Sequence, residues 1–163
     1  MPALRESADG ARFKIRRLDE LAATLQRLRR EGKTIVQCHG VFDLLHIGHI
    51  RHFEQAKTQG DVLVVTVTPD RFVNKGPNHP AFTDQLRVEA IAALHAVDYV
   101  AVNKGPTAVW AIRMLRPDVY VKGPDYGNFA TDRTRGIEAE EAAVMARAIT
   151  VKTSLRSGVC IVL

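Results

Sequence analysis

TIVQCHGVFDLLHIGH, residues 34–49, is the stretch that decides the fold. Its first six residues, 34–39, include Ile35, Val36 and Cys38 and predict a strand that enters a turn at Gly40. Apolar residues then recur at the spacing of one helix face, at Ile47, Ile50, Phe53 and Ala56. Gly60 can end this helix, and the apolar run 61–68 predicts a second strand that is buried on both faces. The segment is therefore organised as a strand, a helix and a second strand.

The rest of the chain continues this alternation. Upstream, four leucines share one helix face that Gly32 can end: Leu18, Leu21, Leu25 and Leu28. Downstream, hydrophobic spacing predicts helices over 84–95, 106–116 and 137–147 and strands over 99–102, 118–122 and 149–151. Alternating elements of these lengths predict an α/β fold with a doubly wound parallel sheet. Ligands are expected where the carboxyl ends of its strands meet helix N-termini.

The segment after the second strand gives sharper local predictions. Residues 69–82 hold three prolines, one glycine and two asparagines, which is typical of a functional loop rather than a simple connector. Thr83 is the predicted N-cap of the following helix. The inward face of that helix is predicted at Leu86, Ala90, Ile91 and Leu94. Phe53 and Trp110 are expected in the core.

The overall composition is that of one globular domain. The chain has 163 residues, of which 46% are hydrophobic and 25% charged, and these values exclude a disordered tail or a collagen-like repeat. We expect a loose leader over 1–13, a single domain over 14–152 and a divergent or truncated tail over 153–163. Two cysteines are too few for a disulfide framework, and there is neither a signal-peptide core nor a run of about 18 apolar residues. A cytoplasmic protein without a membrane segment is therefore expected.

Two histidines in the quoted stretch point to chemistry. His46 and His49 are three residues apart at the start of a predicted helix, so their rings point the same way. Gly48 removes a side chain where a ligand must approach the backbone, and Gly40 permits the tight bend after the strand. A helix N-terminus favours phosphate, and two imidazoles add donors for oxygens whose charge grows during attack at phosphorus. The pattern predicts phosphoryl or nucleotidyl transfer; the alternative is a helix-capping histidine beside a surface histidine.

The motif Gly40-x-Phe42-Asp43-x-x-His46-x-Gly48-His49 resembles the signature of the HxGH nucleotidyltransferase superfamily, in its cytidylyltransferase-like branch. Later segments resemble the adenylyltransferase domain of bacterial heptose phosphate kinase/adenylyltransferase proteins: Lys75-Gly76, Arg87, Ala96-Val97-Asp98 and Val121-Lys122-Gly123-Pro124-Asp125-Tyr126. The resemblance implies that the domain is a Rossmann-like nucleotidyltransferase, commonly a homodimer. It also implies Mg²⁺, a nucleoside triphosphate (ATP or CTP) and the release of pyrophosphate.

The resemblance further implies roles for individual residues. His46 and His49 hold triphosphate oxygens and stabilise the transition state at the α-phosphorus. Lys75 reaches the phosphates of both substrates, and Arg87 binds phosphate. Eight further residues are expected to contact the nucleotide: Gly40, Val41, Phe42, Asp43, Gly48, Lys122, Asp125 and Tyr126. No residue is assigned as a metal ligand. Asp43 is also expected to brace the turn, with a helix N-terminal acid as the alternative, and the open alternative for Lys75 and Arg87 is a solvent-exposed cation.

Two departures from the family pattern bear on function. Asn78-His79-Pro80 stands where an Arg-Pro pair usually follows the lysine and glycine. The closing Ser/Thr-rich motif, which starts a last helix in the family, is not recognisable beyond Thr153-Ser154. In addition, His39 stands where relatives often carry Asn, and it is a candidate ligand contact. These departures leave the second substrate and the level of activity open.

The leading hypothesis is an enzyme that joins a nucleoside triphosphate to heptose 1-phosphate and forms ADP-heptose. The alternatives are a CTP-dependent cytidylyltransferase for glycerol 3-phosphate or a similar polyol phosphate, and a non-catalytic nucleotide-binding paralogue. Of the cations behind the net charge of +5, six are expected on a solvated face: Arg16, Arg17, Arg27, Arg29, Arg30 and Lys33. Lys75, Arg87 and Lys122 fall near ligand-facing ends, so small phosphorylated partners are expected rather than nucleic acid or a membrane.

Overall fold

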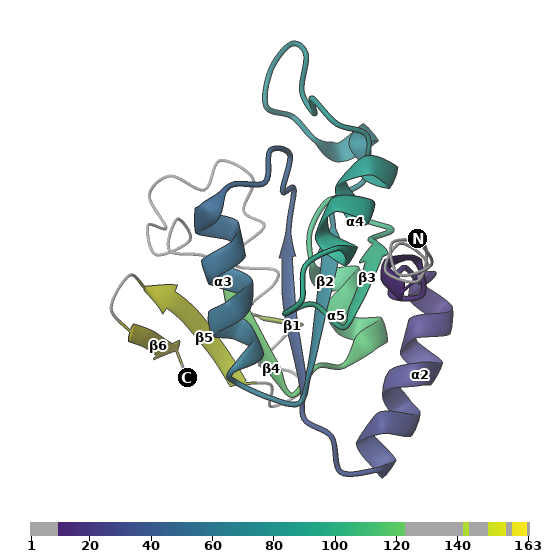
Figure 1. Ribbon diagram of the computed structural model, residues 1–163, viewed down its shortest axis with the longest axis vertical. Coiled ribbons are helices and arrows are strands. Elements are labelled where there is room, and N and C mark those ends of the chain that lie inside the picture. Colours follow the sequence, from purple (N-terminus) through teal and green to yellow (C-terminus); the bar gives the residue numbers. More distant parts are fainter. Residues whose placement is uncertain (1–9, 123–141, 144–149, 156–157, 163) are drawn as a thin grey trace, which may run out of the picture.

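The described strands form one six-stranded sheet in the order β3-β2-β1-β4-β5-β6 (Figure 1). The computed structural model describes residues 10–122, 142–143, 150–155 and 158–162. The strands are β1 (Ile35–Gly40), β2 (Val62–Val67), β3 (Tyr99–Val102), β4 (Val119–Lys122), β5 (Thr150–Leu155) and β6 (Gly158–Val162). The first five pair in parallel, whereas β6 runs antiparallel to β5. The strand order reverses between β1 and β4, which is where doubly wound sheets bind ligands.

Helices cover both faces of this sheet. They are α2 (Leu18–Arg30), α3 (Ile47–Lys57), the 3-10 helix η1 (Asp70–Phe72), α4 (Asp84–Ala92) and α5 (Val109–Leu115). On one face, Phe53 of α3 and Ile91 of α4 pack with Val36 of β1. On the other face, α2 and α5 cover Ile35 and Val64. The predicted doubly wound α/β fold is confirmed, and so is the core position of Phe53, which is fully buried.

Burial explains where these elements form. All six residues of β2 are buried, because helices cover both faces of the sheet. On α2, Leu18, Leu21 and Leu25 are buried, as the leucine spacing predicts. Gly32 follows this helix with a φ of +81°, a conformation that glycine adopts without the strain of a side chain. The strand and helix patterns therefore have the expected origin in packing.

The inward face of α4 differs from the prediction. Thr83 caps the helix as expected, and its Oγ1 accepts the Leu86 backbone N–H at 3.4 Å. Leu86, however, is 52% exposed, and Ala90 is exposed as well. The buried side chains of α4 are Arg87, Val88, Ile91 and Ala92. Ile91 is buried as predicted, whereas the prediction was wrong for Leu86 and Ala90, because Arg87 finds acceptors inside the protein and occupies the inward face.

Trp110 is also exposed, contrary to the prediction of a core position. Its side chain lies on α5 and is 53% exposed. An added Cβ at Gly105 would come within 2.8 Å of Trp110 Cδ1, so the indole lies over the backbone of the loop that precedes α5. Trp110 therefore covers a loop and does not enter the core.

The described ends of the chain join the sheet. Residues 10–12 are helical, and Ile15 forms a parallel bridge to β3. β5 continues to Leu155 and pairs with β6, so part of the expected tail is strand. Of the predicted helix 137–147, only residues 142–143, both helical, lie within the described residues. No helix in the described ranges has the length and apolar character needed to cross a membrane.

Three aspartates line the edge of the sheet at which the parallel strands begin, which we call the N-terminal edge. Asp61, Asp98 and Asp118 each directly precede a strand. Each carboxylate accepts a backbone N–H near the start of a neighbouring strand: Thr34 N to Asp61 Oδ2 at 2.8 Å, Leu63 N to Asp98 Oδ2 at 2.6 Å, and Ile35 N to Asp118 Oδ2 at 2.7 Å. The aspartates therefore satisfy backbone donors where the strands begin.

Candidate active site

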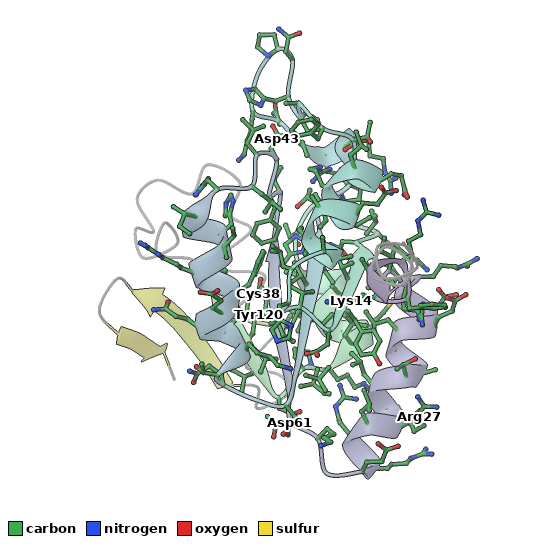
Figure 2. All side chains as sticks on the ribbon, viewed as in Figure 1. Lys14, Arg27, Cys38, Asp43, Asp61 and Tyr120 are labelled. Atoms are coloured by element: carbon green, nitrogen blue, oxygen red, sulfur yellow. The ribbon has the colours of Figure 1, made fainter. Side chains whose placement is uncertain are left out.

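The HIGH turn, residues 40–49, lies at the opposite, C-terminal edge of the sheet. It joins β1 to α3. The Lys75 loop, residues 69–82, follows the neighbouring strand β2 and projects beyond the same edge (Figure 1). Figure 2 shows Asp43 at the base of this projecting loop. The turn thus lies beside the reversal of strand order, where a ligand is expected.

His46 caps the N-terminus of α3 with its own ring. Its Nδ1 accepts the Gly48 backbone N–H at 3.1 Å. A neutral imidazole that accepts at Nδ1 carries its proton on Nε2, so Nε2–H is the donor that the ring can offer to a ligand. Gly48 permits this arrangement, because an added Cβ would lie 2.8 Å from His46 Cε1. The glycine between the two histidines therefore makes room for the first of them.

His49 is held between His46 and Phe42. The two imidazoles are stacked with their centroids 3.9 Å apart, and Phe42 meets His49 edge-on at 5.3 Å. Phe42 has a φ of +49°, which non-glycine residues rarely adopt, and its ring also contacts Phe53 in the core. An added Cβ at Gly40 would lie 2.8 Å from Phe42 Cζ. Gly40 thus allows Phe42 to reach the position from which it orients His49.

The HIGH turn offers hydrogen-bond donors to an anion. It starts an eleven-residue helix, whose first backbone N–H groups and positive dipole end favour phosphate. His46 and Gly48 are exposed and His49 is half-buried, so a phosphate can reach both rings and the backbone. These nitrogen donors fit phosphate oxygens and not a bare Mg²⁺, which takes oxygen ligands. Within the described residues, no group of three His, Cys, Asp or Glu side chains is placed to hold a metal.

His39 is fixed between two threonines immediately before the turn. Its Nδ1 lies 2.9 Å from Thr66 Oγ1, and its Nε2 lies 3.2 Å from Thr68 Oγ1. Burial lowers the pKa of His39 to about 4, against an opposing hydrogen bond from Thr66. The ring is therefore neutral at pH 7 and ties the end of β1 to the end of β2. Both ring nitrogens contact protein hydroxyls, which favours a bracing role over a ligand contact.

Arg87 joins the HIGH turn to both ends of the Lys75 loop. The residue is only 1% exposed. Its guanidinium donates to Val41 O at 2.5 Å, Thr68 O at 2.9 Å, Phe82 O at 3.0 Å and Asp70 Oδ1 at 2.6 Å. This placement differs from the expected phosphate-binding or solvent-exposed arginine, because the guanidinium donates inside the protein. A planar fork of donors suits such simultaneous contacts better than an ammonium would.

Asp43 joins the turn to the loop a second time. Its Oδ1 accepts the Phe82 backbone N–H at 3.1 Å, and its Oδ2 lies 2.9 Å from His79 Nδ1. Desolvation raises the pKa of Asp43, but the backbone N–H groups of Ala81 and Phe82 together with His79 outweigh it and lower the pKa to about 2. Asp43 is therefore an anion at neutral pH. Both oxygens contact the loop, which favours a bracing role over that of a helix N-terminal acid.

The remaining predicted site residues are less closely gathered. Lys75 is exposed on the projecting loop. Lys122 ends β4 beside β1, and its side chain is buried. Asp125 and Tyr126 lie outside the described residues. The structure therefore brings together the predicted residues of the HIGH turn and the contacts of Arg87, whereas Lys75 and Lys122 belong to two other segments.

Sequence reasoning missed three side chains that contact His39 or Asp43 at this edge: Thr66, Thr68 and His79. Thr66 and Thr68 stand out as polar residues near the end of an apolar run, and that signal could have marked them. His79 was noticed as a departure from the family pattern, but its partner Asp43 is 36 residues away in the chain. Local spacing does not reveal such a pair.

Comparison with known sequences places the chain in a family. The cytidylyltransferase-like family profile matches residues 37–157. Bifunctional protein HldE of Syntrophotalea carbinolica is 43% identical over 115 residues, which are 69% of this chain and 24% of that protein. Bifunctional protein HldE of Desulfatibacillum aliphaticivorans is 42% identical over 130 residues, which are 78% of this chain and 26% of that protein. The chain thus spans about a quarter of the length of these relatives.

Solved structures share the fold. The lipopolysaccharide core biosynthesis protein from Thermoplasma volcanium GSS1 superposes with a TM-score of 0.59 at 28% identity, covering 75% of this chain and 94% of that one. Pantoate-beta-alanine ligase from Francisella tularensis superposes with a TM-score of 0.58 at 16% identity, covering 88% of this chain and 67% of that one, and this likeness concerns the fold alone. Because the family profile covers well over half of the sequence and includes the whole HIGH turn, the chain belongs to the cytidylyltransferase-like family.

Proposed function

We propose that this chain is a nucleotidyltransferase that joins a nucleoside triphosphate to a sugar phosphate and releases pyrophosphate. The observation that carries the proposal is the pair of imidazoles at the start of α3, where His46 accepts from Gly48 N–H and stacks on His49 at 3.9 Å. The names of the relatives, bifunctional protein HldE and lipopolysaccharide core biosynthesis protein, support a sugar phosphate as the second substrate. The resemblance described above supports ATP and heptose 1-phosphate as the pair, with ADP-heptose as the product.

The proposed reaction is an in-line displacement at the α-phosphorus. A phosphate oxygen of the sugar phosphate attacks, a new P–O bond forms, and the bond to the leaving pyrophosphate breaks. The attacking oxygen is already an anion, so no general base is needed. His46 Nε2, His49 and the first N–H groups of α3 would donate to oxygens on which negative charge grows. Mg²⁺ would be held by the triphosphate oxygens and would supply charge neutralisation there.

Two lysines have proposed roles on either side of this centre. Lys75 would contact the phosphates of both substrates, because the loop that carries it projects at the same edge as the HIGH turn (Figure 1). Lys122 would face the nucleotide, because it ends β4 at the reversal of strand order. Asp125 and Tyr126 belong to the proposed nucleotide site on the strength of the resemblance alone.

One observation favours a second candidate, a non-catalytic nucleotide-binding paralogue. Thr153-Ser154, the remnant of the closing motif, lies within β5 and not at the start of a helix. A chain that binds nucleotide at the HIGH turn but lacks the closing contact would bind without turnover. The CTP-dependent reaction with glycerol 3-phosphate or a similar polyol phosphate is a variant of the first proposal.

A pyrophosphate-release assay with Mg²⁺ tests these possibilities. ATP and CTP are each combined with heptose 1-phosphate and with glycerol 3-phosphate. We expect release with ATP and heptose 1-phosphate, its loss in His46→Ala, and its retention in His95→Ala, which removes an exposed histidine at the N-terminal edge. If pyrophosphate is released with CTP and glycerol 3-phosphate instead, the result supports the CTP-dependent reaction with a polyol phosphate. If no pair gives release above His46→Ala, the enzyme proposal fails, and calorimetric binding of nucleotide would then support the paralogue.

The finer sequence-based expectations stay proposals. We propose a cytoplasmic homodimer that acts on small phosphorylated substrates and binds neither nucleic acid nor a membrane. Light scattering of the purified chain tests the dimer, and a monomer at micromolar concentration would contradict it. Binding of tRNA with a steep salt dependence would contradict the exclusion of nucleic acid.

A further inference from the structure

We propose that His79 is a positioning residue whose contact with Asp43 holds the Lys75 loop on the HIGH turn. We call this pair, His79 Nδ1 and Asp43 Oδ2 at 2.9 Å, the clasp. The structural part of the proposal, that the clasp holds the loop, rests on the contacts of the chain itself. The catalytic part of the proposal rests on the proposed function, because it concerns the position of Lys75 relative to His46 and His49.

The loop is anchored at both of its ends without the clasp. Arg87 donates to Asp70 at one end and to Phe82 O at the other, so these two points are fixed to α4. Asp43 also accepts from the Phe82 backbone N–H. Between the anchors the chain projects beyond the strand ends (Figure 1). A projecting segment fixed only at its two ends could still pivot as a unit about them.

The clasp removes this freedom by a contact inside the projecting segment. The Asp43 side chain is only 8% exposed and ionised, whereas the His79 side chain is 42% exposed. A histidine N–H that donates to a shielded carboxylate makes a stronger bond than one between neutral groups in water. The second oxygen of the Asp43 carboxylate thereby ties the loop to the turn at His79, three residues before the Phe82 anchor.

Chain distance links the clasp to the donors of the proposed site. His79 is four residues after Lys75, and Asp43 is three residues before His46. One contact thus couples the segment that carries the lysine to the turn that carries the imidazoles. Because positioning of charged groups supplies much of the rate in phosphoryl transfer, a displaced Lys75 would lower turnover even with both imidazoles in place. The position where the family pattern has Arg-Pro therefore has a partner within this protein.

Hydrogen exchange tests the structural part. Amide exchange of peptides covering residues 69–82 is compared in the wild-type chain, His79→Ala, His79→Gln and the control His95→Ala. We expect exchange in His79→Ala to rise about tenfold, partial restoration in His79→Gln, which keeps a side-chain N–H, and no change in the control. Circular dichroism confirms that each variant is folded. Exchange that is unchanged in His79→Ala overturns the clasp.

A double-mutant cycle tests the catalytic part. Pyrophosphate release is measured for Lys75→Ala, His79→Ala and the double variant. If the clasp acts through Lys75, kcat/KM falls about tenfold in His79→Ala, and the double variant loses no more than Lys75→Ala alone. Losses that multiply would show that His79 does not act through Lys75.

The two measurements separate failure of the clasp from failure of the proposed function. A wild-type chain without pyrophosphate release contradicts the function, yet the exchange comparison still decides whether His79 holds the loop. If the chain is active but amide exchange of residues 69–82 is the same in His79→Ala as in the wild type, the proposed function stands and the clasp is overturned.

Discussion

The two edges of the sheet use polar side chains in different ways. At the N-terminal edge, Asp61, Asp98 and Asp118 accept backbone N–H groups at the strand starts. At the C-terminal edge, the HIGH turn presents imidazole and backbone N–H donors outward. Figure 2 shows Asp61 and Asp43 at these opposite ends. In a parallel sheet every strand starts at one edge and ends at the other, so one edge can serve stability while the other serves binding.

Arg87 should be an exception to this division, because it lies at the binding edge and yet should contribute to stability. It lies at the C-terminal edge but donates only to protein acceptors in the described contacts. Arg87→Met leaves three carbonyls, of which that of Thr68 is buried, and the partly exposed Asp70 without their donor, so we expect the free energy of unfolding to fall by about 3 kcal/mol in urea denaturation. Arg87→Lys should not restore it, because an ammonium cannot reach all four acceptors. A loss below about 1 kcal/mol would show that the contacts of Arg87 do not stabilise the turn and the loop.

Matched glycine substitutions at the two edges should give opposite results. In Gly48→Ala, the new Cβ meets only the end of the His46 side chain, which can rotate away. We expect pyrophosphate release to fall about 10²-fold while the fold persists. In Gly60→Ala, the Cβ would lie 2.9 Å from the Thr34 backbone oxygen, so stability should fall by about 1–3 kcal/mol with turnover retained. The same loss of turnover in both variants would contradict the difference proposed between the two edges.

Asp98 should affect stability without affecting turnover. Its carboxylate accepts from Leu63 N–H and pairs with Lys57 at the N-terminal edge. Asp98→Ala leaves a partly buried donor without its acceptor, and we expect a loss of about 1–3 kcal/mol in chemical denaturation. Asp19→Ala is the control, because its pair with Arg17 is exposed and screened by water, so a smaller loss is expected. Equal losses in both variants would contradict a special role for the strand-start aspartates.

The last expected effect is a slope in the pH dependence of stability, which is small over any one pH unit. Burial lowers the pKa of His39 to about 4, and burial with the neighbouring His49 lowers the pKa of His52 to about 4. Between pH 4 and about 6.5 the unfolded chain therefore binds more protons than the folded one, so stability falls as the pH is lowered through this range. Each histidine contributes at most about 1.4 kcal/mol per pH unit. His39→Asn should make the slope shallower in urea titrations, and an unchanged slope would argue against a buried neutral His39.

The sequence predicted the parts of the fold that depend on neighbours in the chain. The strand 99–102 was placed with its observed bounds, and the leucine face of α2 was correct, because hydrophobic periodicity within one element reports burial directly. The HIGH turn was recognised because its glycines, Phe42 and both histidines lie within ten residues. Its chemistry is local, since His46 caps its own helix through Gly48.

The errors arose where distant segments change the environment of a residue. The spacing of apolar residues predicts Leu86 on the inward face, but Arg87 occupies that face because its acceptors come from the turn, from the end of β2 and from the loop. Trp110 was placed in the core because it is large and aromatic, but α5 turns it over a loop. Pattern reasoning assigns a charge to the surface unless it knows of buried partners.

By itself, the sequence determined the doubly wound α/β fold and the place of the HIGH turn in it, because both follow from the periodicity and spacing of residues close together in the chain. Only the tertiary structure decided that Arg87 and Asp43 bind the Lys75 loop to that turn. Those contacts join segments that are far apart in the sequence, and they exist because parallel strands bring the ends of β1 and β2 side by side. The donors of the HIGH turn were visible in the motif, whereas the contacts that fix the Lys75 loop beside them were not.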